Sequence, residues 1–460
     1  MSAKDVAETI VLLLGAGVLL AWLSVRFAVP YPVMLVGAGG LLAFVPGIPS
    51  IPLEPELVLM LFVAPLLFAD AFFAPLHELR RNAGSIARLA SILVLVTAGV
   101  VGVAAHFVVG LPWAVAFTLG AALGATDSLA PTQILGREGA DPRLVAIVRG
   151  ESIFNDGVAF ALVSVASAAA VSSKFDPAAA LGTLALSVVG GIVIGLAVAW
   201  ITAQARQHTD DVMVEAGLSL LTPFAAYIAA DAAHGSGILA AVAAGLYLGR
   251  RSHDMVEPLT RVEIESAWKI ISFVLNSLLF LLVGLQMREI VNAVSTPAGY
   301  VAIVAVVIVA AVVGIRLLWS LAVPAAWRGA RGLAGREVGP ATSRGWRFAL
   351  GWSGPRGAVA LAAALSLPMT VHGGGPTPGR DLVIVLTLIV IVATLGGQGL
   401  TLRPIIRRLG LTDPDGVARE EARAKHVAAE AALGRLDEAA DRHDLDDEQR
   451  DWLEREYAVR

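Results

Sequence analysis

The sequence predicts an all-α fold, in the form of a polytopic membrane protein with about thirteen transmembrane helices. Hydrophobic residues make up 57% of the chain, charged residues only 16%, and the mean hydropathy is +0.74. Soluble globular chains carry about a quarter charged residues. Apolar stretches of at least 18 residues, each able to cross roughly 30 Å of hydrocarbon, recur as far as Leu409. Since unpaired backbone groups in lipid cost several kcal/mol each, these long stretches are expected to be helices.

The apolar stretches define the predicted spans. The N-terminus lacks the basic segment and the small-residue cleavage site of a signal peptide, so we expect the first apolar stretch to be a retained span. Two inverted repeats of six spans, separated by the seventh span, would give the total of thirteen. Windows of about 19 residues place the spans at 8–29, 31–48, 57–75, 86–108, 113–136, 145–172, 178–204, 212–231, 236–249, 265–287, 298–325, 348–369 and 381–406.

Basic residues in the connections predict the orientation. Lys and Arg near span ends are retained in the cytoplasm, so the N-terminus is expected outside and the C-terminus inside. Connections after even-numbered spans hold only Lys174, Arg288 and Arg380. Those after odd-numbered spans hold Arg26, Arg80, Arg81, Arg88, Arg137, Arg143, Arg206, Arg250, Arg251, Arg261, Arg328, Arg331, Arg336, Arg344, Arg347, Arg403, Arg407 and Arg408.

Two domains are predicted, a transmembrane domain over residues 1–409 and a charged cytoplasmic tail over 410–460. Residues 411–460 carry 15 acidic and 8 basic side chains. The turn signal at 413–416 and Gly434 predict one or two solvated helices there. The chain has no Cys, which excludes disulfides and cysteine metal sites. It also lacks a Walker A sequence, so we expect no ATP-driven step.

Ionisable residues inside predicted spans are the first functional candidates. A charged side chain at the bilayer centre costs about 2.5 to 3.5 kcal/mol on insertion scales, so a function usually explains its presence. Asp231 adjoins a Gly-rich turn and is expected at the membrane interface. The candidates are Asp70, Asp127, Glu151, Asp156, Glu215, Asp231 and Arg356.

The sixth span contains the densest polar cluster, at residues 150–157. Ser152 and Asp156 are four residues apart and share one helical face, which offers hydroxyl and carboxylate ligands to a small cation. Glu151 and Asn155 share a neighbouring face. Interhelical hydrogen bonds worth about 1 kcal/mol would explain Ser152 and Asn155, but not two carboxylates within a turn and a half. We therefore predict an ion site at Asp156.

Two Gly- and Pro-rich interruptions occupy corresponding positions of the predicted halves, at residues 124–131 and 351–357. Such paired interruptions indicate broken helices at a transport site near the midplane. The first would bring Thr126 and Asp127 to the ion. The second carries Arg356, which cannot lose its proton and needs a partner. We expect Glu151 to pair with Arg356 and leave Asp156 free to titrate.

Five ordered segments resemble the monovalent cation:proton antiporter-1 family, which includes bacterial NhaP-type sodium/proton antiporters and animal sodium/proton exchangers. The resemblance implies a homodimer in the bacterial inner membrane with crossed broken helices. It implies electroneutral exchange of Na⁺, K⁺ or Li⁺ for H⁺ in pH homeostasis, with no enzyme activity and no cofactor beyond the transported ions. The segments are residues 124–127, 150–157, 234–239, 276–284 and 351–358, within a resemblance from about residue 10 to 408.

The resemblance also assigns residues. It makes Asp156 the carrier of cation and proton, and it pairs the glutamate at 151 with the arginine at 356. Many relatives have a glutamate directly after Leu-Leu-Phe of the third span, where this chain has Ala69 and then Asp70. A shift of one position turns a side chain by about 100°, which argues against a place for Asp70 in the site. Thr126, Asp127 and Ser152 are the other assigned cation ligands, and Asn155 is assigned to the same ion site.

Two other functions are compatible with parts of the sequence. An ion channel would need a continuous pore and no titrating carrier, and flux assays separate the two. The string from Gly351 to Gly354 matches the Gly-x-Ser-Gly of rhomboid-type intramembrane proteases, with Ser353 as nucleophile and His372 as base. A chain with 46 Gly produces such a string readily, and His372 falls at the far end of the span, so we do not expect proteolysis.

Overall fold

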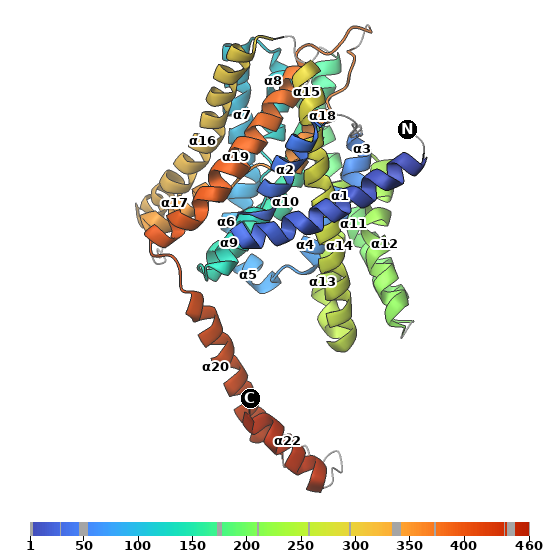
Figure 1. Cartoon of the computed structure of the whole chain (residues 1–460), viewed down its shortest axis with the longest axis vertical. Coiled ribbons are helices and arrows are strands. Elements are labelled where there is room, and N and C mark those ends of the chain that lie inside the picture. Colours follow the sequence, from blue (N-terminus) through green and yellow to red (C-terminus); the bar gives the residue numbers. More distant parts are fainter. Residues whose placement is uncertain are drawn as a thin grey trace.

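The computed structural model confirms the all-α fold, and no strand occurs among the residues that it describes (Figure 1). Each predicted span overlaps at least one helical element, and the third and fourth spans overlap rods made of several consecutive α- and π-helical segments. Within the described part of the chain, eight helices are long and apolar enough to cross a membrane. The number of crossings stays a prediction. The described residues are 3–27, 29–45, 54–172, 177–208, 211–255, 258–293, 296–333, 342–371, 374–436, 438 and 447–459.

The first part of the chain runs through six predicted spans. The fourth begins at Leu76, ten residues before the predicted start, because the rod continues past the apolar stretch as a charged helical segment. Two rods contain π-helical segments. The elements are α1 (Ala3–Phe27), α2 (Tyr31–Leu42), α3 (Pro55–Val58), η1 (Leu59–Val63), α4 (Ala64–Phe72), α5 (Leu76–Arg81), α6 (Ala83–Ala87), η2 (Arg88–Leu93), α7 (Val94–Ala104), η3 (Ala105–Val109), α8 (Trp113–Ala122), α9 (Leu129–Arg137) and α10 (Pro142–Ser172).

The second part contains the other predicted spans and the tail. The ninth continues to Met255, beyond the predicted end at 249, since its polar end also stays helical. The elements are α11 (Pro177–Arg206), α12 (Val212–Ala232), α13 (Gly237–Met255), α14 (Pro258–Leu285), α15 (Met287–Ala293), α16 (Ala298–Leu333), α17 (Arg344–Trp352), α18 (Ala358–Leu365), α19 (Arg380–Arg408), α20 (Pro414–Leu433) and α22 (Asp447–Val459).

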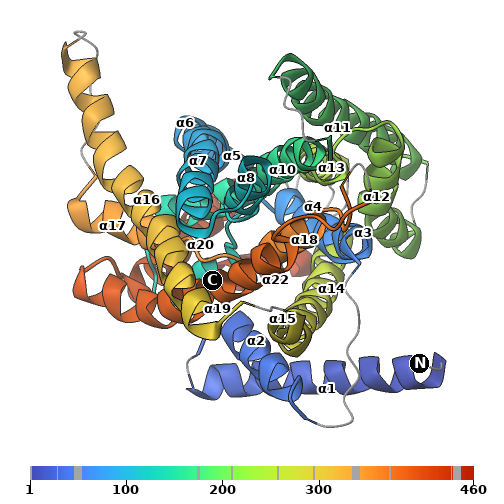
Figure 2. The same ribbon diagram turned by 90° about the horizontal axis from the view of Figure 1, so that it is seen from above.

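Helices of the bundle approach one another closely at glycines. Gly249 of α13 lies against the backbone carbonyl of Phe72 at the end of α4, and Gly39 of α2 lies against the backbone of α14 near Gly284. Transmembrane helices associate through such close packing, because lipid is as apolar as their side chains. In the view from above, α16 lies at one edge and α11 and α12 at the opposite edge, with α4, α10 and α18 between them (Figure 2).

The two predicted breaks meet at the centre of the bundle. The first separates α8 from α9, and the second separates α17 from α18. The backbone N–H of Asp127 donates to the carbonyl of Pro355 at 2.8 Å. A Cβ on Gly357 would lie 2.6 Å from the Cβ of Asp127, so only glycine permits this approach. The two interruptions are therefore in direct contact, while their correspondence within inverted repeats stays a prediction.

The cytoplasmic tail predicted from residue 410 contains α20 and α22, which project from the bundle in Figure 1. Its start is fixed to the α9–α10 connection, where the N–H of Asp413 donates to the carbonyl of Gly139 at 3.0 Å. Beside it, Glu138 accepts hydrogen bonds from Arg407 and Arg403, at 2.5 and 2.6 Å. These bonds, first of all the one from Arg407, hold the pKa of Glu138 below its usual range. The end of α9 is thereby fixed to α19.

Candidate functional site

Asp156 lies in the middle of α10, and its side chain borders a cavity of about 130 Å³. Only 2% of the residue is exposed, and its Oδ1 has no hydrogen-bond partner among the described residues. Ser152, one turn earlier, lines the same cavity, as the four-residue spacing predicts. Thr126 and Asp127 line it from the first break. The structure thus brings these four predicted residues together, and their role as ligands stays a prediction.

Asp127 stands at the N-terminal end of α9. Its Oδ1 accepts a hydrogen bond from the N–H of Leu129, at 2.8 Å. The N-terminal end of a helix carries partial positive charge and favours a carboxylate there. The break therefore orients one Asp127 oxygen through the backbone, while the side chain still reaches the cavity.

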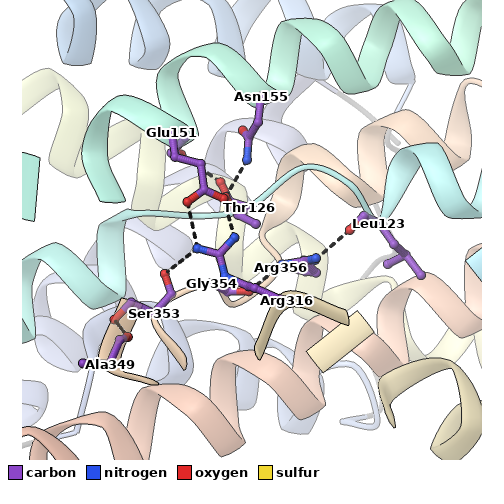
Figure 3. Close-up of polar contacts among 10 residues, drawn as sticks. Leu123, Thr126, Glu151, Asn155, Arg316, Ala349, Ser353, Gly354 and Arg356 are labelled. Atoms are coloured by element: carbon purple, nitrogen blue, oxygen red, sulfur yellow. Dashed lines mark hydrogen bonds and ion pairs between the residues drawn. The ribbon is translucent and has the colours of Figure 1, made fainter. Parts of the chain in front are cut away.

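Thr126 is held in place from α10. Ser152 Oγ donates to the Thr126 carbonyl at 2.8 Å. Asn155 Nδ2 donates to the Thr126 hydroxyl at 2.5 Å (Figure 3). Asn155 is fully buried and is not among the residues that line the cavity. The sequence assigned Asn155 to the ion site itself, whereas the structure shows it behind Thr126, where it supports the break.

The predicted ion pair between Glu151 and Arg356 is wrong. Glu151 pairs with Arg316 of α16, through Nη1 to Oε1 and through Nη2 to Oε2 at 2.8 Å (Figure 3). Both residues are about 1% exposed, so the pair lies fully inside the protein. Arg316 is not among the residues predicted from the sequence, although an arginine inside an apolar span is the same signal that identified Arg356.

Arg356 satisfies its charge on backbone carbonyls instead. Its Nε donates to the carbonyl of Leu123 at 2.7 Å, and its Nη1 donates to the carbonyl of Gly354 at 2.6 Å. Leu123 follows the last residue of α8, where unpaired carbonyls carry partial negative charge. Arg356 therefore caps the first half of the broken helix, and Arg316 neutralises Glu151.

Asp70 of α4 also lines the cavity, contrary to the argument from its helical position. The wall of this cavity extends far enough around α4 to include the Asp70 side chain. The Oδ1 of Asp70 lies 3.5 Å from Nη2 of Arg149. Asp70 thus faces Arg149 as well as the cavity.

The other candidates lie elsewhere. Asp231 is exposed at the end of α12, and Glu215 is buried in its first turn. The hydroxyl of Ser353 is buried and donates to the carbonyl of Ala349 at 2.7 Å. His372, the base that a protease would require, lies outside the described residues.

The cavity offers carboxylate oxygens together with hydroxyl oxygens. Hard oxygen donors suit small cations that carry no preference for sulfur or nitrogen. Among the described residues, no three His, Asp or Glu side chains are grouped closely enough to hold a metal ion. A cation here would therefore depend on hydroxyl or carbonyl oxygens in addition to Asp156 and Asp127.

Comparison with known proteins agrees with this geometry. Residues 10–408 match the family described as "Sodium/hydrogen exchanger, transmembrane". The chain is 32% identical over 459 residues to an uncharacterized Na⁺/H⁺ exchanger of Mycobacterium tuberculosis, covering 98% of this chain and 83% of the relative. It is 33% identical over 379 residues to a sodium, potassium, lithium and rubidium/H⁺ antiporter of Bacillus pumilus, covering 80% of this chain and 56% of the relative.

The fold is also similar to that of a solved structure. The sodium proton antiporter MjNhaP1 of Methanocaldococcus jannaschii superimposes with a TM-score of 0.70 at 21% identity, covering 89% of this chain and 98% of the other. With the family match across nearly the whole helical bundle, this likeness confirms the resemblance found in the five sequence segments. The chain belongs to the sodium/hydrogen exchanger family, whose members are membrane transporters and not enzymes.

Proposed function

We propose that this protein exchanges a monovalent cation for a proton across the bacterial inner membrane, and that Asp156 binds one or the other but never both. The supporting observation is a buried carboxylate on the cavity wall with an oxygen that has no partner among the described residues. The neighbouring Glu151 is already neutralised by Arg316. Asp156 is therefore the carboxylate in α10 that remains available to a positively charged ligand.

Competition at a single carboxylate gives obligatory exchange. Burial disfavours a bare negative charge, so either a proton or a cation neutralises Asp156 at any moment. Alternate exposure of the site to the two sides then carries one ion in each direction, without ATP and without a cofactor. One carrier charge per cycle supports an electroneutral, one-for-one exchange.

Na⁺ is the first candidate for the cation, and K⁺ and Li⁺ are alternatives. The name of the Bacillus pumilus relative includes sodium, potassium, lithium and rubidium, which keeps K⁺ and Li⁺ as alternatives for this chain. We further propose that the protein is a homodimer with its N-terminus outside and its tail in the cytoplasm. The exposed apolar faces of α1 and α11 would then contact lipid or a second copy.

The test is the dissipation of a pH gradient in everted vesicles, followed with a dequenching dye. Na⁺, K⁺ and Li⁺ are added separately to vesicles with and without the protein. The proposal predicts cation-dependent proton movement that saturates. A conductive cation flux that does not require proton movement would identify a channel instead, and no response to any monovalent cation would contradict the proposal.

The protease alternative predicts a different result for Ser353→Ala. The Ser353 hydroxyl only donates to the carbonyl one turn earlier. The variant is therefore expected to retain cation–proton exchange and to lose little stability. The same vesicle assay measures this. Loss of a proteolytic activity in the variant would support the protease.

A further inference from the structure

A second, larger cavity adjoins the one beside Asp156. It has a volume of about 620 Å³ and is lined by residues of α1, α4, α9, α10 and α14. The two cavities share four lining residues, which form the boundary between them, called the neck below. The shared residues are Asp70, Leu129, Ser272 and Asn276.

The larger cavity reaches the surface on the side of the molecule where the tail begins. Exposed side chains line it, including Lys269, at 72% exposure, and Glu265, at 45%. Arg137, the last residue of α9, also lines it and precedes the connection that binds the start of the tail. Water and ions on the tail side therefore have a route to the neck, and loop arginines predict that this side is cytoplasmic.

A charged pair stands at the neck. Asp70 lines both cavities, whereas Arg149 lines only the larger one. Nη2 of Arg149 lies 3.5 Å from Oδ1 of Asp70 and also 3.5 Å from its backbone carbonyl. The two side chains are 30% and 48% exposed, so neither is locked inside the protein. Arg149 is seven residues before Asp156 on α10, which places it about two turns closer to the tail side.

From this arrangement we propose that Asp70 and Arg149 form a charge gate on the cation route from the tail side. Asp70 attracts an arriving cation, and the guanidinium of Arg149 occupies the same carboxylate and repels that cation. The cation must displace Arg149 from Asp70 before it reaches Asp156. The pair would thus set the apparent affinity for the cation on one side of the membrane, which deepens the proposed function and rests on it.

The gate predicts opposite effects for its two members. Arg149→Gln removes the competitor and should lower the KM for the cation, whereas Asp70→Asn removes the attraction and should raise it. For partly exposed charges at this distance we expect changes of roughly two- to fivefold in each direction. The double variant Asp70→Asn with Arg149→Gln should lie between the two.

The experiment measures KM and maximal rate for Na⁺ in everted vesicles, where the tail side faces the added cation. Lys269→Gln is the matched control, because it removes a positive charge from the same cavity at a side chain paired with Glu265 and not with Asp70. We expect its KM shift to be smaller than that of Arg149→Gln. In proteoliposomes of the opposite orientation, the KM of all these variants should match that of the unaltered protein.

A purely structural pair would give another pattern. If the contact only joined α4 to α10, both single variants would lower the melting temperature and leave the KM unchanged, or shift it in the same direction on both sides. Either result would overturn the gate while exchange by the unaltered protein continued. Absence of exchange by the unaltered protein would instead reject the proposed function itself.

Discussion

Vesicles that carry Asp156→Asn are expected to show no cation-dependent proton movement above that of vesicles without the protein. An amide neither takes up nor releases a proton at working pH, and it brings no negative charge to a cation. Asn has nearly the same volume as Asp, so the cavity of about 130 Å³ should keep its shape. The assay is the dequenching of a preformed pH gradient, with cation concentrations that saturate the unaltered protein.

Two controls separate chemistry from folding. The first control is Ser164→Ala. Ser164 lies two turns further along the same helix, and its hydroxyl donates only to the carbonyl of Phe160. This variant should exchange normally. Asp156→Glu keeps a titrating group but moves it by one methylene, so a reduced, non-zero rate is expected. Each variant must elute and melt like the unaltered protein in detergent. Exchange at the normal rate by Asp156→Asn would show that another group carries the proton.

Glu151→Gln should lower the stability of the protein in detergent more than any other single change proposed here. It leaves the guanidinium of Arg316 in a site where the residue is 1% exposed and its Nε already has no partner among the described residues. Breaking one side of a buried pair typically costs about 3 to 5 kcal/mol. A melting temperature lower by several degrees is the expected result, and Arg316→Gln should behave similarly.

Double variants identify the partner of Glu151. Glu151→Gln combined with Arg316→Gln removes both buried charges, so much of the lost stability should return. Glu151→Gln combined with Arg356→Gln should instead be worse than either single change, because Arg356 caps α8 through the carbonyl of Leu123. Recovery in the second combination and not in the first would restore the pairing that the sequence predicted.

Local sequence patterns were sufficient to predict the fold class and to name most of the residues that line the candidate site. Apolar length and composition predict the helices, because the bilayer leaves few other structures for such stretches. The spacing of Ser152 and Asp156 predicts a shared face, since α10 is a continuous helix. Glycine and proline within residues 124–131 and 351–357 predict two breaks, which meet through Asp127 and Pro355.

Local patterns could not identify which residues, far apart in the sequence, contact each other in the fold. Arg316 lies 165 residues from Glu151 in the sequence, and helical spacing does not discriminate between it and Arg356. Asp70 was disfavoured by rotation about its own helix, but the extent of a cavity wall depends on the neighbouring helices. The family resemblance assigns Asn155 to the ion site, and only the packing against Thr126 shows its orientation.

If a proton and a cation compete for Asp156, cation binding must release a proton, and this release can be measured. Purified protein in weakly buffered detergent solution is titrated with Na⁺ while a pH indicator records the protons released. A shared carboxylate predicts release of about one proton for each cation bound, since a ligand must be deprotonated before it binds. It also predicts no release from Asp156→Asn. Saturable cation binding by the unaltered protein without proton release, or equal release from the variant, would contradict the account.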